Sequence, residues 1–154
     1  MLPDPRRVLK DSIEGVAHVG FVVPDLAEAV AEAQRVYGLS ASEIQYVPEP
    51  GVASPTRFAF FTVGGLEFEL IEPVSDDFRD KLLTMPSGGA GINHVAWRVK
   101  DIDEAVACLA AEGIFPGHVT PDGVVRIGEK KMVYLDPDTT GGLVIELIEY
   151  PADA

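Results

Sequence analysis

The sequence contains only one cysteine, Cys108, which excludes a disulfide framework and a cluster of thiolate metal ligands. Basic residues are also scarce, since 12 Lys and Arg stand against 25 Asp and Glu and the formal net charge is −13. Nucleic acids are bound by basic surfaces, so this balance argues against such a partner. No apolar run is long enough to cross a bilayer, and the N-terminal residues lack the apolar stretch of a signal peptide. We therefore expect a cytoplasmic protein that binds neither membranes nor nucleic acids.

One stretch of the sequence occurs twice. Residues 15–30 and 91–106 are identical at eight of sixteen positions, at an offset of 76 residues. A second match, at an offset of 77, relates residues 64–72 to residues 141–149. Two long matches at nearly one offset indicate two copies of a structural unit. We predict one domain over residues 1–154, with one module at about 14–73, a linker at about 74–90 and a second module at about 91–150.

Each copy predicts the same order of elements, β-α-β-β-β, from its hydrophobic periodicity and its turn residues. Asp25 and Asp101 stand at expected helix N-termini, each with a Glu three residues later, as in a capping box. A short additional helix is expected between the copies, within residues 75–85. The predicted strands are 15–23, 43–47, 57–63 and 66–72 in the first copy and 91–99, 117–120, 131–135 and 143–148 in the second, with helices at 26–38 and 103–113.

Each copy supplies one histidine near its start and one glutamate near its end: His18 and Glu69, then His94 and Glu146. Side chains alternate between the two faces of a strand. This alternation places each histidine opposite the bulky residue of its strand, on the face away from the expected helix. The glutamates likewise point away from the apolar face of the last strand.

Taken singly, each glutamate reads as an outward-facing strand residue and each histidine as an ordinary core or surface residue. The recurrence of both types at corresponding places instead favours one shared metal site, and His18 and His94 are two of only three histidines. Two imidazoles with two carboxylates suit Zn, Fe, Co, Ni or Mn, and the spacing does not choose among them.

The duplicated pattern resembles the vicinal oxygen chelate superfamily over about residues 14–150. The resemblance implies an α+β fold in which two tandem βαβββ modules form a cupped eight-stranded mixed sheet, with helices on its outer face and a divalent metal on the other. The superfamily includes glyoxalase I, methylmalonyl-CoA epimerase, extradiol dioxygenases and metal-free resistance proteins.

Within this superfamily, the segments GGAGINHVAWRVKDIDEAV, KKMVYLDPDTTGGLVIELIE and FELIEP are most similar to methylmalonyl-CoA epimerases. The similarity implies a metal bound by His18, Glu69, His94 and Glu146. It also implies two carboxylate bases that remove and return the proton α to a thioester, and these fall on Glu146 and on Glu49, in the segment Glu-Pro-Gly-Val.

Three features depart from the epimerase pattern. About four residues, near ASPT, are inserted after Glu49, Asn93 stands where the family commonly has a histidine, and no clear cluster of basic residues for coenzyme A is present. Arg98, on the His94 face, and Lys131 are the candidate substrate-binding residues, with Arg126 and Lys130 as further cations. A small acyl-CoA thioester is the expected substrate, and a homodimer is expected by analogy.

The leading hypothesis is therefore a metal-dependent isomerase of the acyl-CoA epimerase type. A glyoxalase-I-like lyase uses similar ligands and proton transfer. A ring-cleaving iron dioxygenase typically uses two histidines and one carboxylate, so the fourth ligand, Glu69, argues against it. A non-catalytic binding or resistance protein would be metal-free, and the presence of all four ligand types argues against that class.

Overall fold

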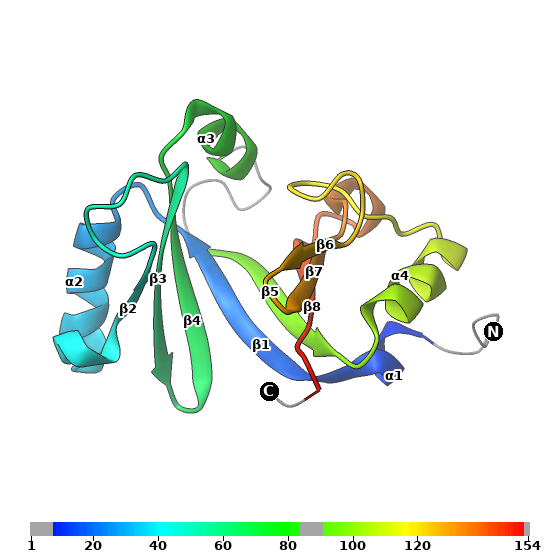
Figure 1. Ribbon diagram of the computed structural model, residues 1–154, viewed down its shortest axis with the longest axis horizontal. Coiled ribbons are helices and arrows are strands. Elements are labelled where there is room, and N and C mark those ends of the chain that lie inside the picture. Colours follow the sequence, from blue (N-terminus) through cyan, green and yellow to red (C-terminus); the bar gives the residue numbers. More distant parts are fainter. Residues whose placement is uncertain (1–7, 84–90, 153–154) are drawn as a thin grey trace. The chain divides into compact units, whose positions relative to one another are not determined.

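The computed structural model describes residues 8–83 and 91–152, which form two compact units (Figure 1). The N-terminal unit comprises His18–Asn93, and the remaining described residues form the C-terminal unit. Each unit contains the helix and the last three strands of one copy of the repeat, whereas β1 and β5 cross the boundary between the units. Among the described residues, no helix has both the length and the apolar character that crossing a bilayer requires.

The helices are α1 (Leu9–Ser12), α2 (Leu26–Tyr37), α3 (Asp76–Leu83) and α4 (Ile102–Ala111). The strands are β1 (Ile13–Val22), β2 (Gln45–Val47), β3 (Thr56–Val63), β4 (Leu66–Pro73), β5 (Ile92–Val99), β6 (Val125–Ile127), β7 (Lys130–Tyr134) and β8 (Ile145–Glu149). Their order in the sheet is β2-β3-β4-β1-β5-β8-β7-β6. The β1–β4 and β5–β8 pairs are parallel. The β2–β3, β3–β4, β6–β7 and β7–β8 pairs are antiparallel, so the predicted eight-stranded mixed sheet is confirmed.

The predicted helix N-termini are where the repeat places them. The Asp25 carboxylate accepts a hydrogen bond from the backbone N–H of Glu28, and the Asp101 carboxylate accepts one from Glu104, each at 2.9 Å. These bonds satisfy backbone donors that a helix cannot pair internally. Helix α2 ends at Gly38, which adopts the left-handed conformation that glycine accepts without strain.

In the N-terminal unit, α2 covers one face of the β3–β4 pair. The buried residues of this core are Leu26, Val30, Ala59, Phe61 and Leu70. A stacked pair of rings, Phe61 and Phe68, extends the cluster with centroids 5.2 Å apart. Each strand residue in this core alternates with one on the other face, and Glu69 lies on that other face.

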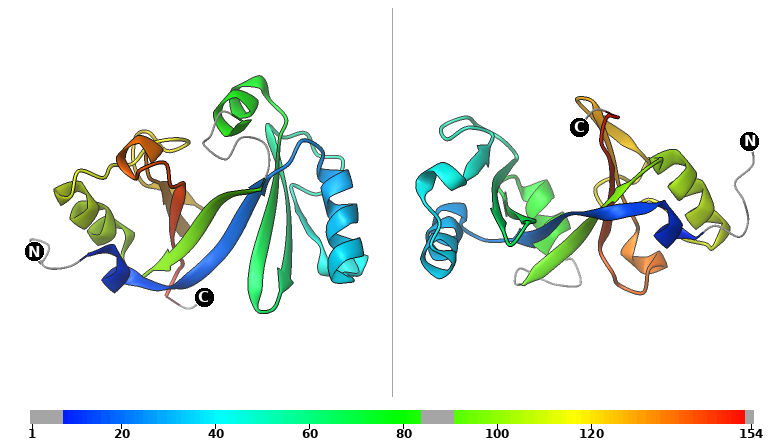
Figure 2. Two further views of the ribbon diagram at one scale, coloured as in Figure 1. Left: turned by 180° about the vertical axis from the view of Figure 1, so that it is seen from behind. Right: turned by 90° about the horizontal axis from the view of Figure 1, so that it is seen from below.

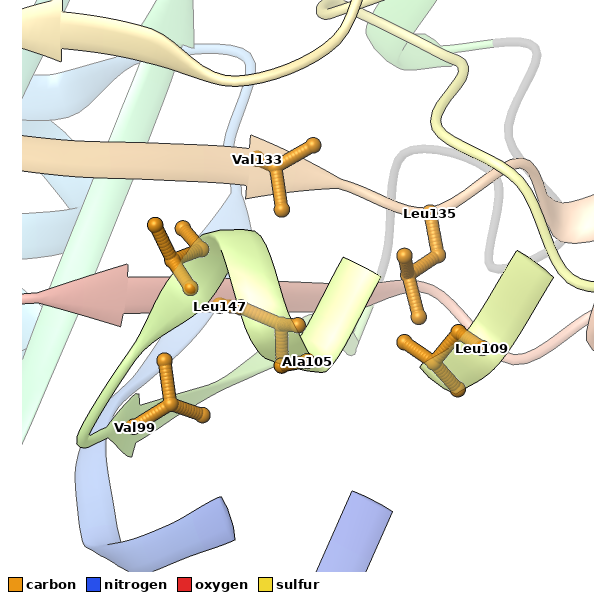
Figure 3. Close-up of a cluster of buried hydrophobic side chains, with 7 residues drawn as sticks. Val99, Ala105, Leu109, Val133, Leu135 and Leu147 are labelled. Carbon is orange, nitrogen blue, oxygen red and sulfur yellow. The ribbon is translucent and has the colours of Figure 1, made fainter. Parts of the chain in front are cut away.

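In the C-terminal unit, α4 covers the corresponding face of β5, β8 and β7. Figure 3 shows the side chains of Val99, Val133 and Leu147 directed toward α4, and the views in Figure 2 place α4 on one side of these strands. Leu147 and Val133 are completely buried. Burial of a Leu or Val side chain stabilises a fold by roughly 1.5–3 kcal/mol. The buried residues of this cluster are Val99, Ile102, Ala105, Leu109, Val133, Leu135 and Leu147.

One predicted strand is wrong. Residues 117–120 form a turn, in which the Thr120 N–H donates to the Gly117 carbonyl, and His118 has a positive φ of 57° that no strand residue adopts. Gly117 also lies too close to Asp136 for a side chain, since a Cβ would come within 2.5 Å of the Asp136 Cβ. Val125–Ile127, which the sequence analysis left unassigned, forms strand β6 instead.

The remaining differences are shifts at the ends of elements. β1 begins at Ile13, two residues earlier than expected, and the short helix α1 occupies part of the expected N-terminal arm. The connector helix is confirmed as α3. The predicted flexible residues of the linker lie at 87–91, and all but Gly91 are outside the described residues.

Candidate metal centre

The N-terminal unit brings His18 and Glu69 together. β1 and β4 are parallel with Gly20 opposite Glu69, so His18, two residues before Gly20, projects from the same face as Glu69. The two side chains are buried, and His18 Nε2 lies 3.6 Å from Glu69 Oε2. Because α2 covers the opposite face, this pair is on the side of the sheet away from the helix.

The C-terminal unit builds the same pair with the same register. β5 and β8 are parallel with Ala96 opposite Glu146, so His94 and Glu146 share a face. His94 Nε2 lies 3.1 Å from Glu146 Oε2, and both side chains are buried. The small residues Gly20 and Ala96 beside the glutamates leave room that a larger side chain would fill.

The chemistry of these donors fits a divalent cation. A carboxylate is costly to bury without a positively charged or hydrogen-bonding partner, and each unit buries one against an imidazole. Imidazole nitrogen and carboxylate oxygen are ligands that Zn, Fe, Co, Ni and Mn accept. Each unit therefore supplies two of the four predicted ligands, already within a few ångströms of each other.

Each of the two glutamates also pairs with an aromatic residue on the antiparallel strand beside it. Phe60 on β3 is opposite Glu69, and Tyr134 on β7 is opposite Glu146. The Tyr134 hydroxyl lies 3.3 Å from His94 Nε2, whereas phenylalanine has no hydroxyl to offer. The sequence analysis missed this pair, because the strands that carry it, 56–63 and 130–134, show no internal match; only the pairing register reveals their equivalence.

Phe60 also borders an open groove in the N-terminal unit with a volume of about 220 Å³. Its ring stacks on that of Phe58, with centroids 6.2 Å apart and an angle of 17° between the planes. Both rings are half-buried and lie on the same face as Glu69. This face therefore combines a buried ligand pair with an apolar surface. The groove is lined by Glu43, Gln45, Phe60, Phe61, Thr62 and Glu67.

Glu49 lies in an exposed turn just after β2. Its carbonyl accepts a hydrogen bond from the Val52 N–H, and its side chain is solvent-exposed. The Val47–Pro48 peptide bond that precedes it is cis. The role of Glu49 as a base stays a prediction.

The two predicted substrate-binding cations lie on different faces. Arg98 lies on the His94 face, two residues after Ala96, which pairs with Glu146. Its guanidinium lies 4.6 Å from the centre of the Tyr150 ring, and its Nε lies 3.9 Å from Glu14 Oε2. Lys131 instead shares the α4 face with Val133, where its Nζ lies 3.1 Å from Asp103 Oδ2 and 3.5 Å from Glu149 Oε2. The hydrogen bond to Asp103, together with the charges of Asp103 and Glu149, raises the pKa of Lys131 above its ordinary value of 10.5. Lys131 thus faces away from Glu146, and its role in substrate binding stays a prediction.

A family model described as the glyoxalase/bleomycin resistance protein/dioxygenase superfamily matches residues 17–134. The chain belongs to this superfamily. The match begins in β1 and ends in β7, so it spans both units and three of the four residues of the His–Glu pairs.

Two curated superfamily relatives are similar over most of their length. The chain is 30% identical over 139 residues to the uncharacterized protein YqjC of Bacillus subtilis, which covers 88% of this chain and 92% of that protein. It is 28% identical over 132 residues to an ethylmalonyl-CoA/methylmalonyl-CoA epimerase of Cereibacter sphaeroides, covering 84% and 93% of the two chains.

Solved structures of the superfamily share the fold at lower identity. A methylmalonyl-CoA epimerase from Mycobacterium tuberculosis has a TM-score of 0.71 at 21% identity, covering 97% of this chain and 96% of its own. A Streptomyces coelicolor epimerase in complex with 2-nitronate-propionyl-CoA has a TM-score of 0.70 at 22% identity, covering 92% and 97%. At this identity the likeness shows the fold alone.

Proposed function

We propose that this protein is a divalent-metal-dependent isomerase that transfers a proton α to a carbonyl, acting as an epimerase on a small acyl-CoA thioester. The observation that carries the proposal is the buried histidine–glutamate pair in each unit, built with the same register on the face away from the helix. The similarity to the Cereibacter epimerase supports the reaction, and the acyl-CoA analogue bound to the Streptomyces protein supports the class of substrate.

In this proposal His18, Glu69, His94 and Glu146 bind one divalent ion. The ion, when bound, polarises a carbonyl oxygen of the substrate and so makes the neighbouring C–H more acidic. Glu146 removes the α-proton from one side of the substrate and Glu49 serves the other side, which inverts the configuration. Arg98 binds an anionic group of the substrate from the His94 face.

The metal is tested by elemental analysis of the purified protein and of matched variants. We expect Glu69→Gln to weaken metal binding by about 100-fold or more, because loss of even an outer hydrogen-bond partner of a ligand costs roughly 10- to 100-fold. Glu67→Gln is the control, since Glu67 lies on the same strand and the same face two residues earlier. Equal metal content in the two variants would remove Glu69 from the ligand set.

The reaction is tested by deuterium exchange into methylmalonyl-CoA in D2O, followed by mass spectrometry with and without EDTA. We expect exchange that EDTA abolishes. Glu49→Gln should retain the metal and slow exchange by about 100-fold or more, the contribution expected of a general base. A metal-containing wild-type protein that exchanges no α-deuterium would contradict the epimerase assignment, and a metal-free one that binds the ligand would favour a binding protein.

A further inference from the structure

A tyrosine with two cations over its ring lies in the C-terminal unit. The guanidinium carbon of Arg98 is 4.6 Å from the centre of the Tyr150 ring, and Lys130 Nζ is 5.6 Å from the same centre. Both distances are within the range over which an aromatic face attracts a cation. Like charges repel each other, so two cations gathered at one ring create a place that an anion would stabilise.

Strand register places these three residues on the face that carries the histidine–glutamate pair. Arg98 lies four residues after His94 on β5, and Tyr150 lies four residues after Glu146, just beyond the end of β8. Even separations along a strand keep side chains on one face. Strands β7 and β8 are antiparallel, which brings Lys130 opposite Tyr150 one position beyond the last pair.

An apolar strip separates the three residues from the His94–Glu146 pair. Ile148 on β8 lies between Glu146 and Tyr150 on this face, opposite Met132 on β7. At about 3.3 Å per strand residue, Tyr150 is roughly 13 Å along β8 from Glu146. A small acyl group bound at the pair does not span this distance, whereas the long tail of a thioester does.

Lys130 differs from its neighbour Lys131 in its partners. Lys131 Nζ lies 3.1 Å from Asp103 Oδ2 and 3.5 Å from Glu149 Oε2. Within residues 8–83 and 91–152, no carboxylate lies at ion-pair distance from the exposed Lys130. This is notable in a chain with 25 Asp and Glu against 12 Lys and Arg, because the ammonium charge of Lys130 remains available to an anion.

The contacts of Arg98 include one loose ion pair. Its Nε lies 3.9 Å from Glu14 Oε2, and the two side chains are 38% and 40% exposed. Exposed pairs of this kind are weak, so an anionic ligand competes with Glu14 for the guanidinium. A phosphate monoester carries a charge of about −1.5 to −2 at pH 7 and three acceptor oxygens, which suits two cations better than a single carboxylate does.

We propose that Arg98, Lys130 and Tyr150 form a binding site for a phosphate group, and that in the acyl-CoA substrate this group belongs to the coenzyme tail. The thioester end of the substrate then lies at the His94–Glu146 pair, and the tail ends at the phosphate site. The assignment to the coenzyme rests on the proposed function, whereas the phosphate site itself requires no metal. Tyr150 is a positioning residue, because its ring holds the two cations side by side.

The test compares three probes by isothermal titration calorimetry of the purified protein. Coenzyme A carries the phosphates, pantetheine lacks the phosphates and the nucleotide, and inorganic phosphate lacks everything else. For Lys130→Gln we expect about 10-fold or more weaker binding of coenzyme A and of phosphate, as for the loss of a hydrogen bond to a charged group, and unchanged binding of pantetheine. Lys10→Gln is the matched control, because it removes an exposed lysine on α1 of the same unit. Thermal unfolding verifies that the variants are folded.

A second variant tests the site in the opposite direction. Glu14→Gln removes the carboxylate that competes for Arg98, so we expect it to raise the affinity for coenzyme A by about two- to fivefold. Damage to the fold would not raise an affinity, so this increase reports the charge itself. Added KCl should weaken the binding of coenzyme A to the wild type and leave the binding of pantetheine unchanged.

The outcomes separate the phosphate site from the proposed function. Weaker binding of coenzyme A and phosphate to Lys130→Gln, with pantetheine unchanged, supports the inference. Binding of phosphate that depends on Lys130, without a preference for coenzyme A over pantetheine, supports the site but overturns its assignment to the coenzyme. Equal affinities of Lys130→Gln and wild type for coenzyme A and for phosphate overturn the site and leave the proposed function intact. Failure of the proposed function is read separately, from metal content and deuterium exchange.

Discussion

The two units build the same histidine–glutamate pair but surround it differently. In the N-terminal unit Glu69 has an apolar neighbour, Phe60, which stacks on Phe58. In the C-terminal unit Glu146 has a hydroxylated neighbour, Tyr134, which reaches His94. The residues suited to bind a cation are thus duplicated, whereas the residues next to them have diverged. One unit has an apolar wall beside its histidine–glutamate pair, and the other has a hydroxyl beside its pair.

A second difference concerns the hydrogen-bond partners of β3 and β7, the third strands of the two modules. In the N-terminal unit the backbone of β2 pairs with β3, with Gln45 opposite Phe60. In the C-terminal unit β6 pairs with β7 only as far as Met132, and the Thr120 side chain completes the hydrogen bonds of Tyr134. The Thr120 side chain therefore bonds to Tyr134 at the place where, in the N-terminal unit, strand β2 pairs with Phe60.

The largest expected effect tests whether both pairs bind the same ion. His18→Ala and His94→Ala should each abolish retention of the metal, because each removes one imidazole ligand from a shared site. Metal content per chain, measured by elemental analysis, gives the result, with His118→Ala as the histidine control. Retention of half the metal in either variant would indicate two independent sites.

The next effect compares the two cores at equivalent positions. Leu70→Ala and Leu147→Ala should each lower the free energy of unfolding by about 2–5 kcal/mol, the usual cost of such a cavity. Leu147 is completely buried and Leu70 is 7% exposed, so we expect the larger loss for Leu147. Urea unfolding measures both values. A larger loss for Leu70 would show that the N-terminal core tolerates a cavity less well.

A smaller effect tests the hydrogen bond between the Thr120 side chain and the Tyr134 backbone. Thr120→Val should lower the free energy of unfolding by about 1–3 kcal/mol, since it leaves the buried Tyr134 N–H without its acceptor. Thr62→Val, on the exposed surface of β3, is the control and should change stability little. Equal stability of the two variants would mean that the Thr120 hydroxyl is dispensable.

The smallest effect compares the cations that stand opposite the last glutamate of each unit. The raised pKa of Lys131 means that its pairing stabilises the fold fully below pH 10.5, and that this contribution is lost as the pH rises through the folded-state pKa. In the N-terminal unit Arg57 stands opposite Glu72, and an arginine does not titrate in this range.

Urea unfolding at neutral and alkaline pH should therefore show a slightly steeper loss of stability for wild type than for Lys131→Gln. The corresponding comparison with Arg57→Gln should show no difference in slope. Parallel pH profiles for wild type and Lys131→Gln would contradict the assignment of the shift to Asp103 and Glu149.

The sequence by itself determined the duplicated elements and the four candidate ligands. The repeat aligned His18 with His94 and Glu69 with Glu146, and strand alternation placed them on the face away from the helices. Both conclusions depend only on the repeat and on the alternation of side chains along a strand, which can be read from the sequence. The same local signals identified Asp25 and Asp101 as the helix N-caps.

Only the tertiary structure decided which side chains neighbour these ligands. Tyr134 approaches His94 through strand register, and Thr120 and His118 contact Tyr134 from a turn at Gly117. Neither the register nor the turn has a periodic signal in the sequence. The strand predicted at 117–120 was wrong for the same reason, since Gly117 and Thr120 bond to Tyr134 from a turn and not from a paired strand. The charge of Lys131 can be read from the sequence, whereas the face of the sheet that it occupies is set by its pairing with Glu149. Contacts between residues distant in sequence depend on register, and register is a property of the folded sheet.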